Sequence, residues 1–263
     1  MTEYHIQIAE HVIHVVCESA LLSKIFSNHF QILSQKQQQR MPDLHIRVID
    51  GFGASFTTDL VKITRKDNDI FFQRTDYFIQ VDTSYQKATI WAYNGLALKH
   101  AMMNLYSSFI VHHEWGLLIH SSCVLENRKG HLFAGHSGDG KSTAARLSFP
   151  RKLFADEASI VKMEQEQIKV FNSPFRSGMK AGTSNESAEL ASIQLLRQSK
   201  RNERIKLEKS DALLELMDKI FFWSPGQTET RKIVQMVTNI VKKVPIYELY
   251  FQKNPTFWEL ISS

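Results

Sequence analysis

Hydrophobic and polar residues alternate along most of the first third of the chain. A period of two predicts β-strands, and it recurs over residues 4–8, 11–15, 43–49, 69–74, 77–82 and 88–93. Such alternation is typical of antiparallel strands with one face in water. One helix is predicted between them, at about residues 19–30. The glutamine-rich residues 35–40 are expected to form a loop or a helix tail, with no assigned function.

The period changes after Asn94-Gly95. Over residues 96–113 the apolar side chains recur at helical spacing and share a broad face, and Gly116 is placed to end this helix. A stripe of methionine and aromatic residues of this kind is far more often a core-facing surface than a cofactor site. We therefore interpret this helix as a structural element.

The rest of the chain mixes short strands with helices. Strands are predicted at residues 117–125, 131–134, 153–155, 159–163, 168–171, 192–197 and 246–251, and helices at 141–147, 211–222, 228–241 and from about 256. This order predicts an α/β fold with a mixed sheet. We expect a β-rich N-terminal domain of unknown role at residues 1–93 and a second, α/β domain at residues 94–263.

One motif in the second domain carries chemistry. Residues 135–142 fit the P-loop pattern GxxxxGK[ST], in which glycines let successive backbone N–H groups point at phosphate oxygens. Asp139 would repel a phosphate if it pointed inward, so we expect it to point away. The residues predicted to bind the nucleotide are Gly135, His136, Ser137, Gly138, Asp139, Gly140, Lys141, Ser142 and Thr143.

The context of the motif supports this interpretation. An apolar strand at residues 131–134 precedes it, and a helix-forming stretch follows it. Glycine, serine and aspartate alone could serve a turn, but the Lys141-Ser142-Thr143 ending is not needed for one. Lys141 would reach the β- and γ-phosphates and Ser142 would bind Mg²⁺. The motif therefore predicts ATP and Mg²⁺ as ligands.

A P-loop enzyme also needs an acidic partner for the metal or for the attacking hydroxyl. Asp156 and Glu157 directly follow the short strand at 153–155, so they could face the γ-phosphate from a neighbouring strand end. We predict Ser142, Asp156 and Glu157 as metal ligands. The alternative is an acidic turn or a helix cap.

His120 lies in an apolar strand that is expected to run beside the strand preceding the P-loop. A histidine in such a strand is usually a core residue whose hydrogen bonds are satisfied. The sequence by itself leaves both a structural and a catalytic role open for His120.

Composition narrows the classes of function. The chain has 263 residues, with 32 Lys and Arg against 27 Asp and Glu, a net charge of +5. This excess suits a nucleotide and does not call for nucleic acid, and we expect no nucleic-acid partner. The two cysteines, Cys17 and Cys123, fit buried apolar positions in a reducing compartment. We see no signal peptide and no run of about 18 apolar residues, so we expect a cytoplasmic protein without a membrane span.

Two stretches around the P-loop are familiar. Ile119-His120-Ser121-Ser122-Cys123-Val124, followed by residues 132–143, resembles the catalytic core of the HPr serine kinase family. It is most similar to smaller kinase-like relatives found with peptide-modification gene clusters. Residues 153–157, 172–178, 192–196 and 244–249 extend the similarity, which covers about residues 116–263. The β-rich N-terminal part lies outside it.

The resemblance implies a fold related to HPr kinases and phosphoenolpyruvate carboxykinases, and an ATP-dependent kinase that phosphorylates serine in a peptide or protein. Asp156 would accept the proton of the serine hydroxyl or hold Mg²⁺, and His120 would lie near it and tune it. Arg176 would contact the phosphate or the substrate. The relatives also imply a homo-oligomer, although no interface is readable in the sequence.

The chain departs from the family pattern in two ways. Only one aspartate, Asp156, stands beside Glu157 where the family usually has two adjacent aspartates, and Asp156 could match either of them. The loop that HPr kinases use for the reverse reaction is not recognisable. Two alternatives therefore stay open. One is a small-molecule or carboxykinase-like phosphotransferase, and the other is a non-catalytic module that binds nucleotide and escorts a peptide.

Overall fold

The computed structural model describes residues 1–34, 37, 40–178 and 184–262. Within these residues the chain forms two compact units, the first built mainly from Met1–His112 and Phe222–Thr230. The second is built mainly from the chain after His112, apart from that returning segment. Most of the glutamine-rich stretch at 35–40 lies outside the described residues.

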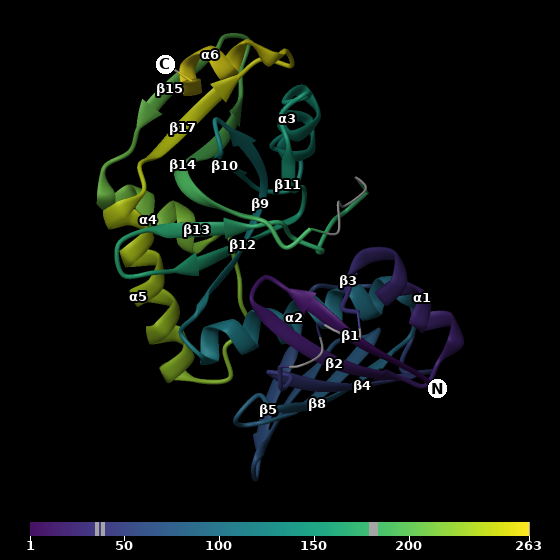
Figure 1. The fold of residues 1–263 in the computed structure, drawn as a ribbon. Coiled ribbons are helices and arrows are strands. Elements are labelled where there is room, and N and C mark those ends of the chain that lie inside the picture. The colour runs from purple at the N-terminus through teal and green to yellow at the C-terminus, as the bar shows by residue number, and fades with distance from the viewer. Residues whose placement is uncertain (35–36, 38–39, 179–183, 263) are drawn as a thin grey trace. The chain divides into compact units, whose positions relative to one another are not determined.

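The first unit contains a mixed β-sheet (Figure 1). Among the described residues the sheet has eight strands in the order β3-β1-β2-β4-β8-β7-β6-β5. β2 pairs with β4 and β4 with β8 in parallel, and the other pairs are antiparallel. The elements are β1 (Thr2–Ile8), β2 (His11–Cys17), α1 (Ala20–His29), β3 (Gln31–Ile32), β4 (Leu44–Asp50), β5 (Lys62–Lys66), β6 (Asp69–Gln73), β7 (Tyr77–Asp82), β8 (Lys87–Ala92) and α2 (Gly95–His112).

One face of this sheet is apolar because every second residue of its central strands is buried. Helices α1 and α2 cover that face. Tyr4 of β1 packs on Phe26 of α1, and the Tyr77 hydroxyl of β7 accepts a hydrogen bond from Asn104 of α2 at 3.0 Å. The helix predicted at 96–113 is confirmed as α2, and it falls in the first unit rather than with the P-loop segment.

The second unit holds the P-loop segment and a larger mixed sheet. Its described elements are β9 (Gly116–Glu126), β10 (Lys129–Ala134), α3 (Lys141–Leu147), β11 (Leu153–Ala155), β12 (Ala158–Met163), β13 (Ile168–Phe171), β14 (Ser187–Gln198), β15 (Glu203–Lys206), α4 (Lys209–Met217), β16 (Ile220–Phe221), β17 (Ile246–Phe251), η2 (Pro255–Trp258) and α6 (Glu259–Ser262). Helix α5 (Gln227–Lys243) begins in the returning segment of the first unit and continues into the second.

The pairings in this sheet close on themselves. β10, β9, β12, β13 and β14 follow one another, and β14 pairs again with β10. Closure is possible because β9 and β14 are long: β9 pairs with β12 near its start and with β10 near its end. β14 pairs in parallel with both β10 and β17 (Figure 1). The mixed α/β architecture predicted for the second unit is confirmed. In the first unit, where antiparallel strands were expected, β2–β4 and β4–β8 are parallel pairs.

Tertiary pairing corrects one predicted element. The helix expected over residues 211–222 ends at Met217 as α4, and Ile220–Phe221 forms the strand β16. Ile220 and Phe221 pair with Ile119 and Leu118 of β9, and these long-range hydrogen bonds override the local helical pattern. No helix among the described residues is long and apolar enough to cross a membrane.

Candidate functional site

The P-loop connects strand β10 to helix α3, as the sequence predicts. Gly138 and Gly140 have left-handed backbone conformations, with φ of 92° and 109°. Gly140 also lies against Phe251 of β17, where an added Cβ would come within 2.7 Å of the ring. The turn and the packing beneath it therefore both require glycine at position 140.

The loop wraps around the ammonium group of Lys141. This side chain is only 8% exposed, and its Nζ donates to the carbonyl oxygens of Gly135 and His136, each at 2.8 Å. Burial lowers the pKa of Lys141, and nearby Lys219 lowers it further, while Asp139 opposes the shift. The loop thus holds a buried positive charge that is bonded to neutral backbone oxygens.

Asp139 was expected to point away from a bound phosphate. Its carboxylate turns back and accepts a hydrogen bond from the backbone N–H of His136. On the outer side of the loop, Gln198 of β14 donates its side-chain N–H to the Gly138 carbonyl at 2.7 Å. Both contacts help to fix the loop conformation.

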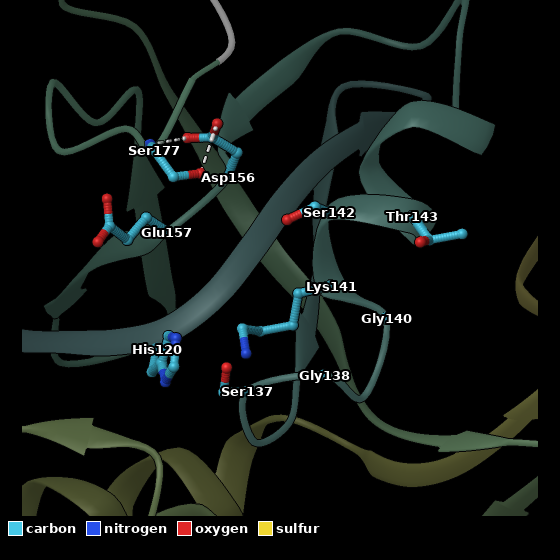
Figure 2. Close-up of a pocket in the computed structure, with 10 residues that line it drawn as sticks. All are labelled: His120, Ser137, Gly138, Gly140, Lys141, Ser142, Thr143, Asp156, Glu157 and Ser177. Carbon is cyan, nitrogen blue, oxygen red and sulfur yellow. Dashed lines mark hydrogen bonds between the residues drawn. The ribbon is translucent and has the colours of Figure 1, made fainter.

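A cavity of about 320 Å³ opens beside the loop (Figure 2). It brings together P-loop residues with the predicted acidic residues and His120. The lining residues are His120, Ser137, Gly138, Gly140, Lys141, Ser142, Thr143, Asp156, Glu157 and Ser177. Gly135, His136 and Asp139 of the predicted nucleotide site, and Arg176 of the predicted catalytic set, are not among these lining residues.

Asp156 reaches the cavity because two strands pair with β9 in succession. Ala155 of β11 pairs with Cys123, and Ala158 of β12 pairs with His120, so Asp156 and Glu157 form the step between them. Asp156 is 3% exposed, and residues 177 and 178 hold its carboxylate through hydrogen bonds. It accepts hydrogen bonds from the N–H of Ser177 at 3.2 Å, the hydroxyl of Ser177 at 3.2 Å and the N–H of Gly178 at 3.3 Å.

Arg176 is buried, and its hydrogen bonds stabilise the strand β11 that directly precedes Asp156. Its guanidinium donates to the carbonyl oxygens of Leu153 and Phe154, at 3.2 and 3.0 Å, and also to Ser173 and Asn172. Burial lowers the pKa of Arg176, and the charge of Asp156 opposes this shift. Arg176 therefore does not line the cavity but binds the backbone of β11.

His120 is neutral near pH 7 in this environment. Burial, followed by the charge of Lys141, lowers its pKa from 6.5 to about 4, and Glu157 acts in the opposite direction. The imidazole lies against Phe221 with 5.0 Å between ring centres. A neutral imidazole in the cavity wall can donate or accept a hydrogen bond without adding charge.

Sequence reasoning missed Lys219, which lies between the loop and β9. It is 2% exposed, and its Nζ donates to His136 Nε2 at 2.9 Å and to the carboxylate of Asp218 at 2.8 Å. Its carbonyl oxygen accepts the backbone N–H of His120 at 2.7 Å. The sequence placed this lysine near the end of a predicted helix, where a solvated side chain is usual, so it gave no signal.

The oxygen donors at the cavity suit a magnesium ion shared with phosphates. Mg²⁺ prefers hard oxygen ligands and usually takes one or two carboxylates together with substrate phosphates. The Ser142 hydroxyl and the carboxylates of Asp156 and Glu157 all line the cavity. Among the described residues, no group of three or more His, Cys, Asp or Glu gathers into a metal site made by the protein alone. The donor set fits an ion bound together with a nucleotide.

The comparisons with known proteins concern the same part of the chain. The family described as "SynChlorMet cassette protein ScmC" matches residues 83–263. The chain belongs to this family. The matched range includes the P-loop, His120, Asp156 and Lys219. The resemblance to HPr serine kinases, which was drawn from motifs, stays a prediction beside this membership.

One solved structure with a similarity to this chain is the HPr(Ser) kinase/phosphatase from Coxiella burnetii. The two share 10% sequence identity with a TM-score of 0.31, over 55% of this chain and 91% of that chain. A likeness of this strength carries no information about function. No curated protein matches the chain.

Proposed function

We propose that this protein is an ATP-dependent kinase that transfers the γ-phosphoryl group to a serine hydroxyl of a peptide or protein. The observation that carries the proposal is the composition of one cavity. A P-loop with its buried lysine and its serine forms one part of the wall, and two carboxylates and a neutral histidine form another (Figure 2). Phosphoryl transfer requires these two sets of groups to face the same reacting phosphate.

Lys141 and the loop backbone would bind the phosphates. The lysine ammonium now bonds to two neutral carbonyl oxygens, and phosphate oxygens would be stronger partners because they carry charge. The left-handed glycines at 138 and 140 turn the backbone so that amides can approach the phosphates closely. This group of contacts stabilises negative charge on the γ-phosphoryl group as it leaves ADP.

Asp156 would receive the proton of the acceptor hydroxyl. Three donors from Ser177 and Gly178 hold its carboxylate in place, and Arg176 fixes the strand from which it projects. His120 would contribute a neutral hydrogen-bonding group near this carboxylate. Ser142 and Glu157, with Asp156, are the residues that would hold Mg²⁺, which when bound would neutralise charge on the triphosphate.

Serine in a peptide is the acceptor class that the motif resemblance favours. A decisive assay supplies Mg²⁺, ATP labelled on the γ-phosphate and a library of serine-containing peptides, and locates the label by mass spectrometry. We expect Lys141→Ala and Asp156→Asn each to lower transfer by a factor of about 10² to 10³. Lys129→Ala is the matched control, because Lys129 lies on the adjoining strand β10 but is exposed and pairs with Glu189.

Other outcomes of this assay would reject the proposal. Label found only on a metabolite would indicate a small-molecule kinase. Tight ATP binding without transfer to any acceptor would indicate a nucleotide-binding escort module. Equal transfer by the wild type and Lys141→Ala would exclude the P-loop as the catalytic element.

A further inference from the structure

The proposed function uses Ser177 only to hold the Asp156 carboxylate and gives its hydroxyl no part in the reaction. Ser177 is exposed, it lines the cavity together with Lys141 and Ser142, and its hydroxyl lies 3.2 Å from the Asp156 carboxylate (Figure 2). The hydroxyl donates its proton towards the oxygen that the proposed mechanism assigns as the proton acceptor. A substrate serine would have to make this same contact before it could attack the γ-phosphate.

We propose that Ser177 is an autophosphorylation site, modified by ATP bound at the P-loop of the same chain. The inference rests on the proposed function and goes beyond it, because it names a modified residue within this protein. It requires a nucleophilic hydroxyl, a base in contact with it and a phosphate-binding loop on one shared cavity. Ser177, Asp156 and the residues around Lys141 meet these three requirements.

The chemical step balances without any further reactant. The Ser177 Oγ forms a new bond to the γ-phosphorus of ATP, and the bond from that phosphorus to the β–γ bridging oxygen breaks. ADP leaves with the electron pair of the broken bond. The hydroxyl proton passes to Asp156, to which it is already directed. The products are ADP, phosphoserine and a protonated carboxyl group.

The location of Ser177 distinguishes it from other hydroxyls at the site. Ser137, Ser142 and Thr143 belong to the P-loop or to the start of α3. Figure 2 shows Ser177 beside Asp156 at one side of the cavity and Ser137 beside Lys141 at the other. In-line attack needs a nucleophile opposite the leaving ADP. A hydroxyl on the Asp156 side suits this requirement, whereas a hydroxyl within the phosphate-binding loop does not.

Modification would change the charge of the site. Phosphoserine carries about two negative charges near neutral pH, and here it would stand beside Asp156 and Glu157. Repulsion between these groups opposes the binding of a second triphosphate in the cavity. We therefore expect the phosphorylated chain to transfer phosphate to added peptides more slowly than the unmodified chain.

Ser177→Ala removes the nucleophile and leaves the base in place. The backbone N–H groups of residue 177 and Gly178 still donate to Asp156 in this variant. Ser177→Thr retains a hydroxyl at the same position and serves as the matched control. Asp156→Asn retains the shape of the side chain but removes its ability to accept the proton.

The test incubates the full chain with Mg²⁺ and γ-labelled ATP without any acceptor and maps the label by peptide mass spectrometry. We expect up to one phosphate per chain, on Ser177, at a rate independent of protein concentration. In Ser177→Ala the amount of label should fall at least about tenfold. Ser177→Thr should carry the label on the threonine, and Asp156→Asn should slow labelling about 100-fold.

A parallel reaction with the peptide library separates this inference from the proposed function. Label on peptides without label on Ser177 would overturn the inference and leave the kinase assignment standing. Label on another residue, or a rate that rises with protein concentration, would also overturn it. If ATP neither bound nor reacted, both proposals would fall together.

Discussion

Buried charges are handled differently in the two units of this protein. In the first unit, Arg74 and Asp76 are both buried and form two hydrogen bonds with each other, at 2.7 and 2.9 Å. Arg74 also donates to His100 Nδ1 at 2.7 Å. In the second unit, the buried ammonium group of Lys141 donates to two backbone carbonyl oxygens. The buried ammonium group of Lys219 donates to His136 and to the carboxylate of Asp218, whose side chain is 63% exposed.

The contrast shows that burial of a charge does not by itself identify a functional site. A buried cation that is paired with a buried carboxylate has its charge neutralised, and removing either partner strongly destabilises the folded protein. A buried cation bonded to neutral oxygens or to an exposed partner keeps most of its attraction for an anion that enters. We therefore expect the partner of a buried charge, rather than its depth, to distinguish a core ion pair from an anion-binding site.

The largest effect that this comparison predicts is the loss of stability when the buried Arg74–Asp76 ion pair is broken. Arg74→Met leaves the Asp76 carboxylate buried without its partner, so the free energy of unfolding should fall by about 3–5 kcal/mol. Urea unfolding measures this loss. The control is Arg74→Met combined with Asp76→Leu, which removes both charges and should recover much of the stability. ATP affinity should stay unchanged in folded protein, and a loss of affinity without a loss of stability would break the comparison.

The next effect concerns the backbone of the P-loop. Gly140→Ala combines a left-handed conformation with a clash against Phe251, so we expect ATP affinity to fall by about 2–3 kcal/mol, measured by calorimetric titration. Gly138→Ala is the matched control, because it has the same conformational strain but no heavy atom within 4 Å of the added Cβ, and it should cost about 1 kcal/mol. Equal effects at both positions would mean that the packing on Phe251 is irrelevant.

A smaller effect is expected at Lys219. Lys219→Met removes a buried positive charge near the loop, so the dissociation constant for ATP should rise about tenfold, or about 1.4 kcal/mol. Stability should change by less than about 1 kcal/mol, because the lost hydrogen bonds are offset by the lost cost of burying the ammonium. Asp218→Asn, which leaves the cation in place, is the control and should bind ATP at least as tightly as the wild type.

The last prediction concerns the pH dependence of stability in the second unit. Burial, followed by the charge of Arg204, lowers the pKa of His131 to about 4, as burial and Lys141 do for His120. The unfolded chain, with its ordinary value of 6.5, binds more protons between pH 6.5 and about 4. Stability should therefore be full above pH 6.5 and decrease as the pH falls through this window.

Thermal unfolding at a series of pH values tests that expectation. His131→Gln should reduce the acid-side loss, since glutamine has no proton to gain. The same loss in His131→Gln and in the wild type would place the responsible groups elsewhere.

Much of this arrangement could be predicted from local sequence, and the features that could not be predicted have physical causes. Alternation of apolar residues predicts the main strands, and the P-loop pattern identifies Lys141 and Ser142. The structure brings Asp156, Glu157 and His120, the candidate residues of the sequence analysis, to the same cavity as the loop. His120 lies on β9, and Asp156 and Glu157 directly follow β11, which pairs with β9, so their positions depend on short segments of chain.

The residues that sequence reasoning missed or placed differently depend on distant contacts. Lys219 reaches the loop because β16 pairs with β9, about a hundred residues earlier in the chain. Ser177 and Arg176 act on Asp156 and on β11 across an intervening hairpin of two strands. Arg176 was predicted at the substrate, but its guanidinium donates to the backbone carbonyl oxygens of Leu153 and Phe154 in β11. Such contacts leave no periodic signal in the sequence.

Calorimetric titration of the wild type and Lys141→Ala with ATP, with and without Mg²⁺, tests the central claim most directly. The account predicts that the wild type binds one ATP per chain more tightly when Mg²⁺ is present. It predicts that Lys141→Ala loses at least about 2 kcal/mol of that binding free energy. Absence of binding to the wild type, or equal binding by the two proteins, would contradict the account.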